Sequence, residues 1–297
     1  MSRKRILIIH NPTSGRRNAE VMATVAVRLT DLGARVDIRV TEGSGHASEL
    51  AAEVETDSQD CIIAAGGDGT VNEVMNGMIK LDAAPPLGII PLGTANVLAH
   101  EIDLPLKAAG LARVLFEGPT RVLYPGIVNS AGESPRLFAQ MTGAGLDARI
   151  VAGVNPALKR LFGKGAYGVE TMAQWLRGGL PSYDICIDGE KFKAGSVIIA
   201  NGKLYGGKFV AAPMADISTP GFQVLLLPGG RLAMLGNAAA LFAGRLSQSR
   251  DVRVVTGHKI SLNGPMGEPL QADGDLLGHL PVTVEASEKP VMVVTPE

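Results

Sequence analysis

Cysteines, aromatic side chains, net charge and long apolar runs are all scarce in this chain of 297 residues. The two cysteines, Cys61 and Cys186, exclude a disulfide framework, and both lie in apolar runs typical of buried small side chains. A formal net charge of −1 gives no overall attraction to nucleic acid, so no nucleic-acid partner is expected. No apolar run approaches the roughly 20 residues of a spanning helix or the roughly 7–15 of a signal-peptide core. We therefore expect a cytoplasmic protein that is still able to sit on a membrane surface.

Several catalytic signatures are also missing. There is no G-x-x-x-x-G-K-S/T loop and no G-x-S-x-G elbow, and the five histidines show no metal-ligand spacing. Gly143–Ala148 matches G-x-G-x-x-A, but it lies in a β-rich region without a βαβ unit, so a Rossmann site is not expected there.

Residues 1–121 alternate between short apolar strands and helices. Strands are predicted at 5–10, 34–40, 61–65 and 87–90, and helices at 17–32, 45–55, 70–79 and 94–101. This alternation predicts an α/β domain whose parallel sheet is covered on both faces and binds ligands at the carboxyl ends of its strands.

Residues 122–297 have a different pattern, in which short extended segments are separated by Gly, Pro, Asn and Asp. We predict a β-sandwich domain with helical insertions at 148–180 and 231–247, and the last ten or so residues are able to return to the first domain.

The segment Gly66-Gly67-Asp68-Gly69-Thr70 follows a predicted strand and opens a predicted helix. Glycines let the backbone approach a ligand, and free amides at a helix start bind phosphate. Asp68 is placed to help hold Mg²⁺ on such phosphates. The spacing of Thr70 and Glu73 also fits a capping box that needs no ligand, and the two interpretations are compatible.

Two further loops follow predicted strands in the same way. The first contains Asn11, Pro12, Ser14, Gly15 and Arg16, and the second is Pro91–Asn96, in which Thr94 also fits a helix N-cap. Either loop alone is compatible with an ordinary turn. Three such loops on one sheet favour a nucleotide site.

Asp273-Gly274-Asp275 places two carboxylates around a glycine near the end of the chain. One of them is able to act as a general base toward a hydroxyl, but the spacing alone fits a solvated Asp-Gly turn better.

Together these segments resemble the diacylglycerol kinase catalytic family, which includes bacterial lipid kinases and the sphingosine and ceramide kinases. The resemblance rests on Asn11-Pro12 with Ser14-Gly15, on Thr41 with Gly45-His46-Ala47, on Gly66–Thr70 with Asn72-Glu73, and on Pro91–Asn96. It covers nearly the whole chain and implies ATP and Mg²⁺ as cofactors. It makes Asp275 the general base, Asp68 and Asp273 the acids that support the metal or the base, and Thr41, Glu73, Thr94 and Asn96 part of the nucleotide site.

Three positions depart from the family pattern. Asp275 stands where the family often has Glu, and Val97-Leu98-Ala99 stands where it often has D-F-A. Pro220 occupies the place of an acid that helps hold a second, structural metal in bacterial members, which argues against that metal here.

The resemblance implies a membrane lipid with a primary hydroxyl, such as diacylglycerol, ceramide or a sphingoid base, as the acceptor. The basic and apolar residues of 154–180 suit transient contact with the inner face of a membrane, or a helix that covers the sandwich, and 232–242 suits an acyl-chain pocket. The alternatives are an enzyme similar to NAD kinases that phosphorylates a soluble nucleotide, and a catalytically silent binding protein. A homodimer is neither indicated nor excluded.

Overall fold

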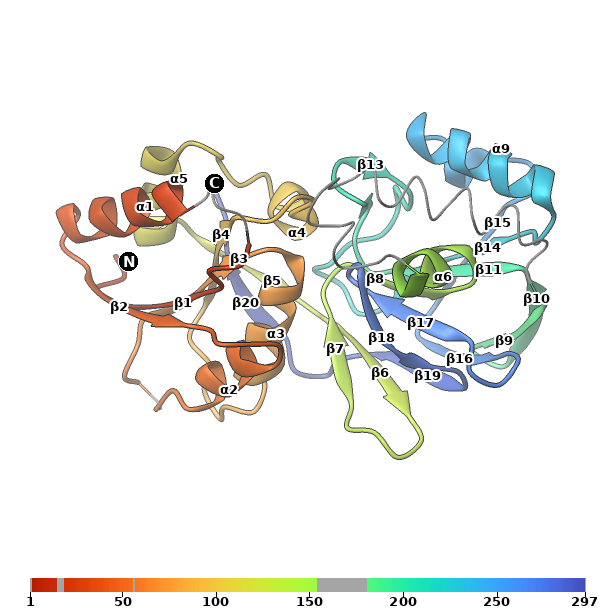
Figure 1. The fold of residues 1–297 in the computed structure, drawn as a ribbon, viewed down its shortest axis with the longest axis horizontal. Coiled ribbons are helices and arrows are strands. Elements are labelled where there is room, and N and C mark those ends of the chain that lie inside the picture. Colours follow the sequence, from red (N-terminus) through yellow and green to blue (C-terminus); the bar gives the residue numbers. More distant parts are fainter. Residues whose placement is uncertain (1, 15–18, 56, 154–180, 297) are drawn as a thin grey trace. The chain divides into compact units, whose positions relative to one another are not determined.

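The computed structural model of the chain describes residues 2–14, 19–55, 57–153 and 181–296, and the predicted membrane segment 154–180 lies outside them (Figure 1). The chain divides into two compact units. The N-terminal unit is Met1–Tyr124 together with Lys289–Glu297, and the C-terminal unit is Pro125–Glu288.

A six-stranded sheet in the order β2-β1-β3-β4-β20-β5 forms the centre of the N-terminal unit. Its strands are β1 (Arg5–His10), β2 (Arg35–Val40), β3 (Cys61–Gly66), β4 (Leu87–Pro91), β5 (Thr120–Leu123) and β20 (Val291–Val294). The first five in spatial order run parallel, and β5 is antiparallel to β20. Every residue of β3 is buried, as expected for a strand covered on both faces. Cys61 at its start is fully buried, whereas Cys186 is only partly buried.

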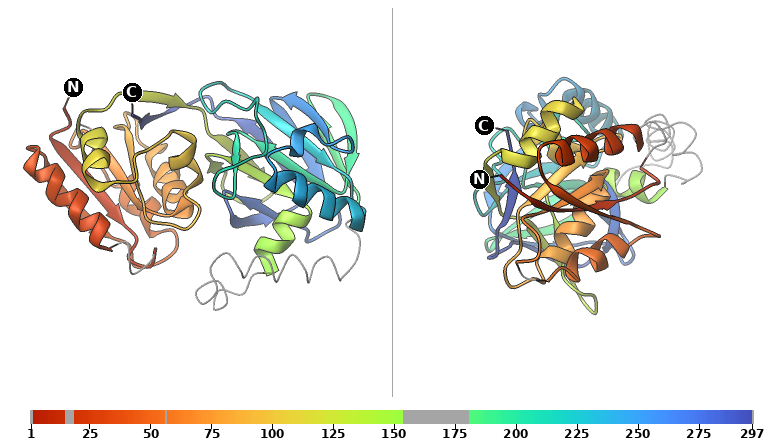
Figure 2. Two further views of the ribbon diagram at one scale, coloured as in Figure 1. Left: turned by 90° about the horizontal axis from the view of Figure 1, so that it is seen from above. Right: turned by 90° about the vertical axis from the view of Figure 1, so that its left-hand side faces the viewer.

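Helices cover both faces of this sheet (Figures 1 and 2). One layer holds α1 (Ala19–Asp31) and α5 (Ala108–Glu117), and the other holds α2 (His46–Ala52) and α3 (Asp68–Met78). The short helix α4 (Val97–Glu101) follows β4. The predicted α/β architecture is confirmed. The sequence reasoning missed α5, which buries Leu111, Ala112, Leu115 and Phe116 on one face.

The strand β20 lies between β4 and β5, although it comes from the last residues of the chain. The strand β5 pairs only with β20 within the described sheet. The backbone therefore leaves the N-terminal unit after Tyr124 and re-enters it at Lys289, so the N-terminal unit is built from both ends of the chain.

The C-terminal unit contains two six-stranded sheets that share one apolar core. The first sheet has the order β10-β9-β16-β19-β6-β7 and the second has the order β15-β14-β11-β8-β17-β18. The strands of the first are β6 (Gly126–Ser130), β7 (Arg136–Phe138), β9 (Tyr183–Ile187), β10 (Glu190–Ala194), β16 (Lys259–Asn263) and β19 (Val282–Ala286). Those of the second are β8 (Met141–Ala144), β11 (Ser196–Ala200), β14 (Phe222–Leu227), β15 (Arg253–Gly257), β17 (Pro269–Ala272) and β18 (Asp275–His279). This arrangement confirms the predicted sandwich.

Helices and a small hairpin accompany the second sheet (Figure 1). Helix α6 (Leu146–Gly153) follows β8, α9 (Arg231–Phe242) follows β14, and a 3₁₀ turn, η2, spans Leu246–Gln248. The hairpin consists of β12 (Leu204–Tyr205) and β13 (Phe209–Val210). A second apolar cluster joins the sheet to α9 through Leu225, Leu241 and Leu246. No helix among the described residues is long and apolar enough to cross a bilayer.

Candidate active site

Three loops meet at the carboxyl edge of the N-terminal sheet, after β1, β3 and β4. The chain leaves β1 toward β2 on one side and β3 toward β4 on the other, so the direction of winding switches between β1 and β3. In open α/β sheets such a switch point is where ligands bind. Asn11 follows β1 at this point, and its side-chain amide donates a hydrogen bond to Thr70 Oγ1 at 3.1 Å. The two predicted loops are therefore joined directly.

The loop after β1 is organised by Asn11 itself. Its backbone N–H donates to the Ala65 carbonyl at 2.9 Å, and its Oδ1 accepts from the N–H and the hydroxyl of Thr13. Ser14 N–H reaches the Asn11 carbonyl at 3.3 Å. Pro12 lies within this turn, and the predicted residues Gly15 and Arg16 lie outside the described residues.

Helix α3 begins at Asp68, with Gly67 as its N-cap residue. The first hydrogen bond inside the helix runs from Val71 N–H to the Gly67 carbonyl at 3.1 Å. The helix therefore presents its first amides, those that precede Val71, at the carboxyl edge of the sheet, and a helix start of this kind binds phosphate in other proteins. A Cβ at Gly66 would lie 2.3 Å from Thr70 Oγ1, so this position accepts only glycine without rearrangement.

The loop after β4 packs directly on the Gly66–Thr70 loop. Leu92 N–H donates to the Gly66 carbonyl at 2.8 Å, and a Cβ at Gly93 would lie only 2.5 Å from the Gly67 Cα. Asp68 Oδ1 accepts a hydrogen bond from Val97 N–H, the first amide of α4, at 2.6 Å. Asp68 therefore stabilises the start of α4 with one carboxylate oxygen.

The predicted N-cap at Thr94 was wrong, because α4 begins three residues later with Asn96 as its cap residue and Thr94 is exposed. Asn96 has a left-handed backbone with φ of 47° and holds the loop through its own side chain. Its Oδ1 accepts from Gly93 N–H and its Nδ2 donates to the Gly93 carbonyl. Asn tolerates this backbone conformation better than most residues.

The predicted capping box of Thr70 and Glu73 was also wrong, since α3 has no side-chain cap. Glu73 instead reaches the start of α2, where its two carboxylate oxygens accept from Gly45 N–H at 2.9 Å and Ala47 N–H at 3.3 Å. A carboxylate at a helix start is favourable because it complements the helix dipole.

Thr41 is buried directly after β2, and its N–H donates a hydrogen bond to the His10 carbonyl. Burial lowers the pKa of His10, because it disfavours the charged form of the imidazole.

In the C-terminal unit, Asp273 and Gly274 form the two-residue turn of the β17–β18 hairpin, with φ of 49° and 86°. Positive φ at both positions is typical of the hairpin turns that favour Asp-Gly. The Asp273 carboxylate accepts from three consecutive backbone amides, those of Ala139 at 2.7 Å, Gln140 at 2.8 Å and Met141 at 3.0 Å. Asp275 starts β18 with an exposed side chain. Asp273 thus ties the hairpin that carries Asp275 to the β7–β8 connection.

A second polar group, which sequence reasoning missed, supports the same hairpin. Asp147, in the first turn of α6, accepts a hydrogen bond from the Tyr205 hydroxyl and is hydrogen-bonded to the Gln271 side chain. Gln271 Oε1 in turn accepts from Gly274 N–H at 3.1 Å. Burial raises the pKa of Asp147 to about 6, although its two hydrogen bonds act in the opposite direction.

An ion pair fixes the same helix α6 to the sandwich. Arg149 contacts both oxygens of Glu268, and the Tyr183 hydroxyl donates to Glu268 Oε2 at 2.6 Å. Burial alone would raise the pKa of Glu268, but the hydrogen bonds from Arg149 and Tyr183 lower it below its ordinary value. These partners lie far apart in the sequence, so no local spacing could have predicted them.

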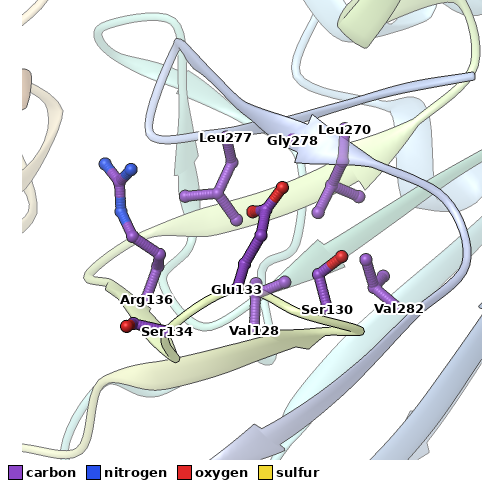
Figure 3. A pocket seen from close by; sticks show the side chains of 9 residues that line it. All are labelled: Val128, Ser130, Glu133, Ser134, Arg136, Leu270, Leu277, Gly278 and Val282. Carbon is purple, nitrogen blue, oxygen red and sulfur yellow. The ribbon is translucent and has the colours of Figure 1, made fainter. Parts of the chain in front are cut away.

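Two cavities of the C-terminal unit are lined by residues other than these. One is enclosed between Glu133, Arg136, Leu270 and Leu277, and its volume of about 10 Å³ holds one water molecule at most (Figure 3). The other, of about 460 Å³, is an open groove over Asn129, Ser261 and Thr283. Among the described residues, no three His, Cys, Asp or Glu side chains form a metal cluster, and Asp216 Oδ1 accepts from Ser218 N–H.

Comparison with known proteins decides the family. Residues 5–126 match the diacylglycerol kinase catalytic domain, and residues 140–295 match the YegS C-terminal NAD kinase beta sandwich-like domain. A "Diacylglycerol kinase" of Staphylococcus saprophyticus is 30% identical over 303 residues, which cover 99% of this chain and 96% of the relative. The chain belongs to the diacylglycerol kinase family. It is a lipid kinase with an ATP-dependent catalytic domain, as the sequence motifs predicted.

Other members of the diacylglycerol kinase family share this full-length organisation. A "Diacylglycerol kinase" of Bacillus subtilis is 29% identical over 302 residues, which cover 99% of this chain and 97% of the relative. A Bacillus anthracis protein solved under the same family name superposes with a TM-score of 0.84 at 21% identity, over 99% of this chain and 96% of that one. The structural likeness shows a common two-part fold.

Proposed function

We propose that this kinase transfers the γ-phosphate of ATP to the primary hydroxyl of diacylglycerol. The observation that carries the nucleotide half is the joining of the loops after β1, β3 and β4 at the amino-terminal end of α3, through the bonds of Asn11 to Thr70, Leu92 to Gly66 and Val97 to Asp68. The first amides of α3 face the phosphates, with Asn11 and Thr70 beside them. The choice of diacylglycerol follows full-length relatives at 28–30% identity, each of which bears the name "Diacylglycerol kinase".

We further propose Asp275 as the general base. It takes the proton of the lipid hydroxyl, and the hydroxyl oxygen then attacks the γ-phosphate as ADP leaves. The exposed carboxylate at the start of β18 is accessible to an acceptor, and the bonds of Asp273 and Gln271 hold the hairpin that carries it. Such positioning and electrostatic stabilisation supply most of the catalysis in phosphoryl transfer.

Mg²⁺ fits the N-terminal site through Asp68. One oxygen of this carboxylate is bonded to Val97 N–H, and the residue stands at the helix start proposed to hold the phosphates. Mg²⁺ is commonly bound in kinases by one or two carboxylates together with phosphate oxygens, and it neutralises their charge. Asp273 fits a metal less well, because both of its oxygens already accept backbone hydrogen bonds.

A lipid acceptor requires work at a bilayer surface, so we propose transient contact with the inner face of a membrane, where ATP is present. The inner side of α9 packs on the second sheet through Ala240 and Leu241, and a role of this helix in an acyl-chain pocket stays a prediction.

The test is transfer of labelled phosphate from ATP to a panel of diacylglycerol, ceramide, sphingosine and NAD. We expect phosphorylated diacylglycerol, and Asp275→Asn should lower kcat by about 10²–10⁴-fold with little change in the KM for ATP. Its thermal stability should stay close to that of the wild type, because the side chain is exposed. Transfer to NAD alone, or near-normal activity of Asp275→Asn, would contradict the substrate or the base assignment respectively.

A further inference from the structure

We propose that the outward face of α9 is a docking surface for bilayers that contain anionic lipid. This inference rests on the proposed function, since a lipid kinase has to reach an acceptor within a bilayer, and it names the surface that makes the contact. We define the α9 face as Leu232, Leu235, Gly236 and Ala239, which recur at the spacing of one helix face and are all exposed.

The α9 face differs from the outward side of α5, another surface helix among the described residues. Leu232 is 84% exposed and Leu235 is 50% exposed, whereas the opposite side of the helix buries Met234 and Asn237. Helix α5 shows the ordinary arrangement, because its outward side carries the exposed ion pair of Arg113 and Glu117. A surface helix whose outer side lacks charge while its inner side is packed leaves apolar area for a partner.

Charge identifies that partner. The 34 positions between Asp216 and Asp251 contain no acidic residue but do contain three arginines, at 231, 245 and 250. Arg245 and Arg250 are exposed just beyond the carboxyl end of α9, and Asp251 is the first acid after them. An apolar helix face bordered by cations is the composition that binds at the interface of an anionic bilayer. Figure 1 shows α9 lying along the outside of the C-terminal unit, on the far side of its sheet from the sandwich core.

The apolar part of the contact is that of two leucines and two small residues. The small residues Gly236 and Ala239 let the helix lie flat, while the leucines enter the boundary between headgroups and acyl chains. Such a shallow contact with few cations suits reversible binding, in which the enzyme leaves after each encounter.

The experiment measures co-sedimentation of the full chain with vesicles of phosphatidylcholine, with and without phosphatidylglycerol, in the absence of ATP and diacylglycerol. The double variant Leu232→Gln/Leu235→Gln should weaken binding to the anionic vesicles by about tenfold or more. Arg245→Gln and Arg250→Gln should each weaken it by roughly fivefold at low salt. The matched control is Val27→Gln, because Val27 is 60% exposed on α1 in the other unit and should not affect binding.

Thermal unfolding of each variant verifies that it folds, and Leu232→Ser serves as a second variant if the double one does not. The proposal is overturned if the folded leucine variants bind anionic vesicles as tightly as the wild type does. It is also overturned if Val27→Gln loses as much vesicle binding as the leucine variants, or if the wild-type protein does not bind anionic vesicles. Loss of a dimer in the leucine variants with vesicle binding intact would also overturn it, since the face would then bind a second copy. The co-sedimentation experiment contains neither ATP nor diacylglycerol, so its outcome does not depend on the proposed reaction. A failed phosphate-transfer assay would therefore count against the proposed reaction and would not affect the measured vesicle binding.

Discussion

Replacing Asp273 by Asn tests whether this carboxylate organises the protein or serves the metal. Asn keeps the size of the side chain and tolerates the positive φ of 49°, so the change acts mainly on the three hydrogen bonds. If its oxygen faces Gln140 and Met141, two bonds survive in weaker, neutral form, and the new NH₂ group faces the donor of Ala139. Hydrogen bonds to charged groups contribute about 1.5–3 kcal/mol each, against roughly 0.5–1.5 kcal/mol for neutral ones.

The expected loss of stability for Asp273→Asn is about 2–4 kcal/mol, with the partial exposure of the site taken into account. For a unit of this size that loss lowers the melting temperature by about 4–16 °C. Calorimetry without nucleotide or Mg²⁺ measures it, and Asp275→Asn, at the other end of the same turn, is the matched control. An unchanged melting temperature combined with a raised Mg²⁺ requirement would refute the structural role and favour the metal role.

The remaining predictions concern three other positions. Glu73→Gln should destabilise the N-terminal unit by about 1–2 kcal/mol, because it removes the negative charge that accepts the first amides of α2. An unchanged melting temperature with a raised KM for ATP would instead indicate a direct role of Glu73 in nucleotide binding. Gly93→Ala should raise the KM for ATP by about tenfold or more, because the added Cβ would collide with Gly67. The control is Gly110→Ala, whose Cβ would meet only ordinary van der Waals contacts and should leave the KM for ATP unchanged. Equal effects of the two substitutions on this KM would contradict the packing of the two loops. Burial raises the pKa of Asp147 from 3.8 to about 6, so the stability that its protonated form contributes is present below pH 3.8 and is lost as the pH rises through about 6. Asp147→Asn should therefore lose less stability than the wild type between about pH 5 and pH 7.5, by about 1–2 kcal/mol in chemical denaturation, and parallel pH profiles would contradict the raised pKa.

Sequence patterns predicted the elements that depend on local periodicity. The strands β1, β3 and β4 follow from their apolar runs, and the turn at Asp273-Gly274 follows from its residue types. The extended stretch at the junction of the two units forms two strands, β5 and β6, which are separated by Tyr124 and Pro125. Proline has no N–H for the ladder, which explains the break.

The roles of individual acids were harder to predict, because their partners are distant in sequence. Glu73 has the spacing of a local cap but bonds to Gly45 and Ala47, and Asp273 bonds to amides more than a hundred positions earlier. A carboxylate in such a sequence pattern is able to bind a metal ion, to act as a general base or to accept hydrogen bonds from backbone amides. Only the folded chain shows which donors surround it. The meeting of the N-terminal loops, in contrast, follows from the parallel sheet itself.

The position of β20 affects how the protein is made. Until Pro125–Glu288 has left the ribosome, β5 has no partner and β4 presents an open edge. During that interval the loops that precede α3 and α4 lie on an incomplete sheet. The unpaired strand edges of such a sheet are able to pair with other chains. A premature stop just before Val291 would leave every residue of those loops intact and still remove the strand that completes their sheet.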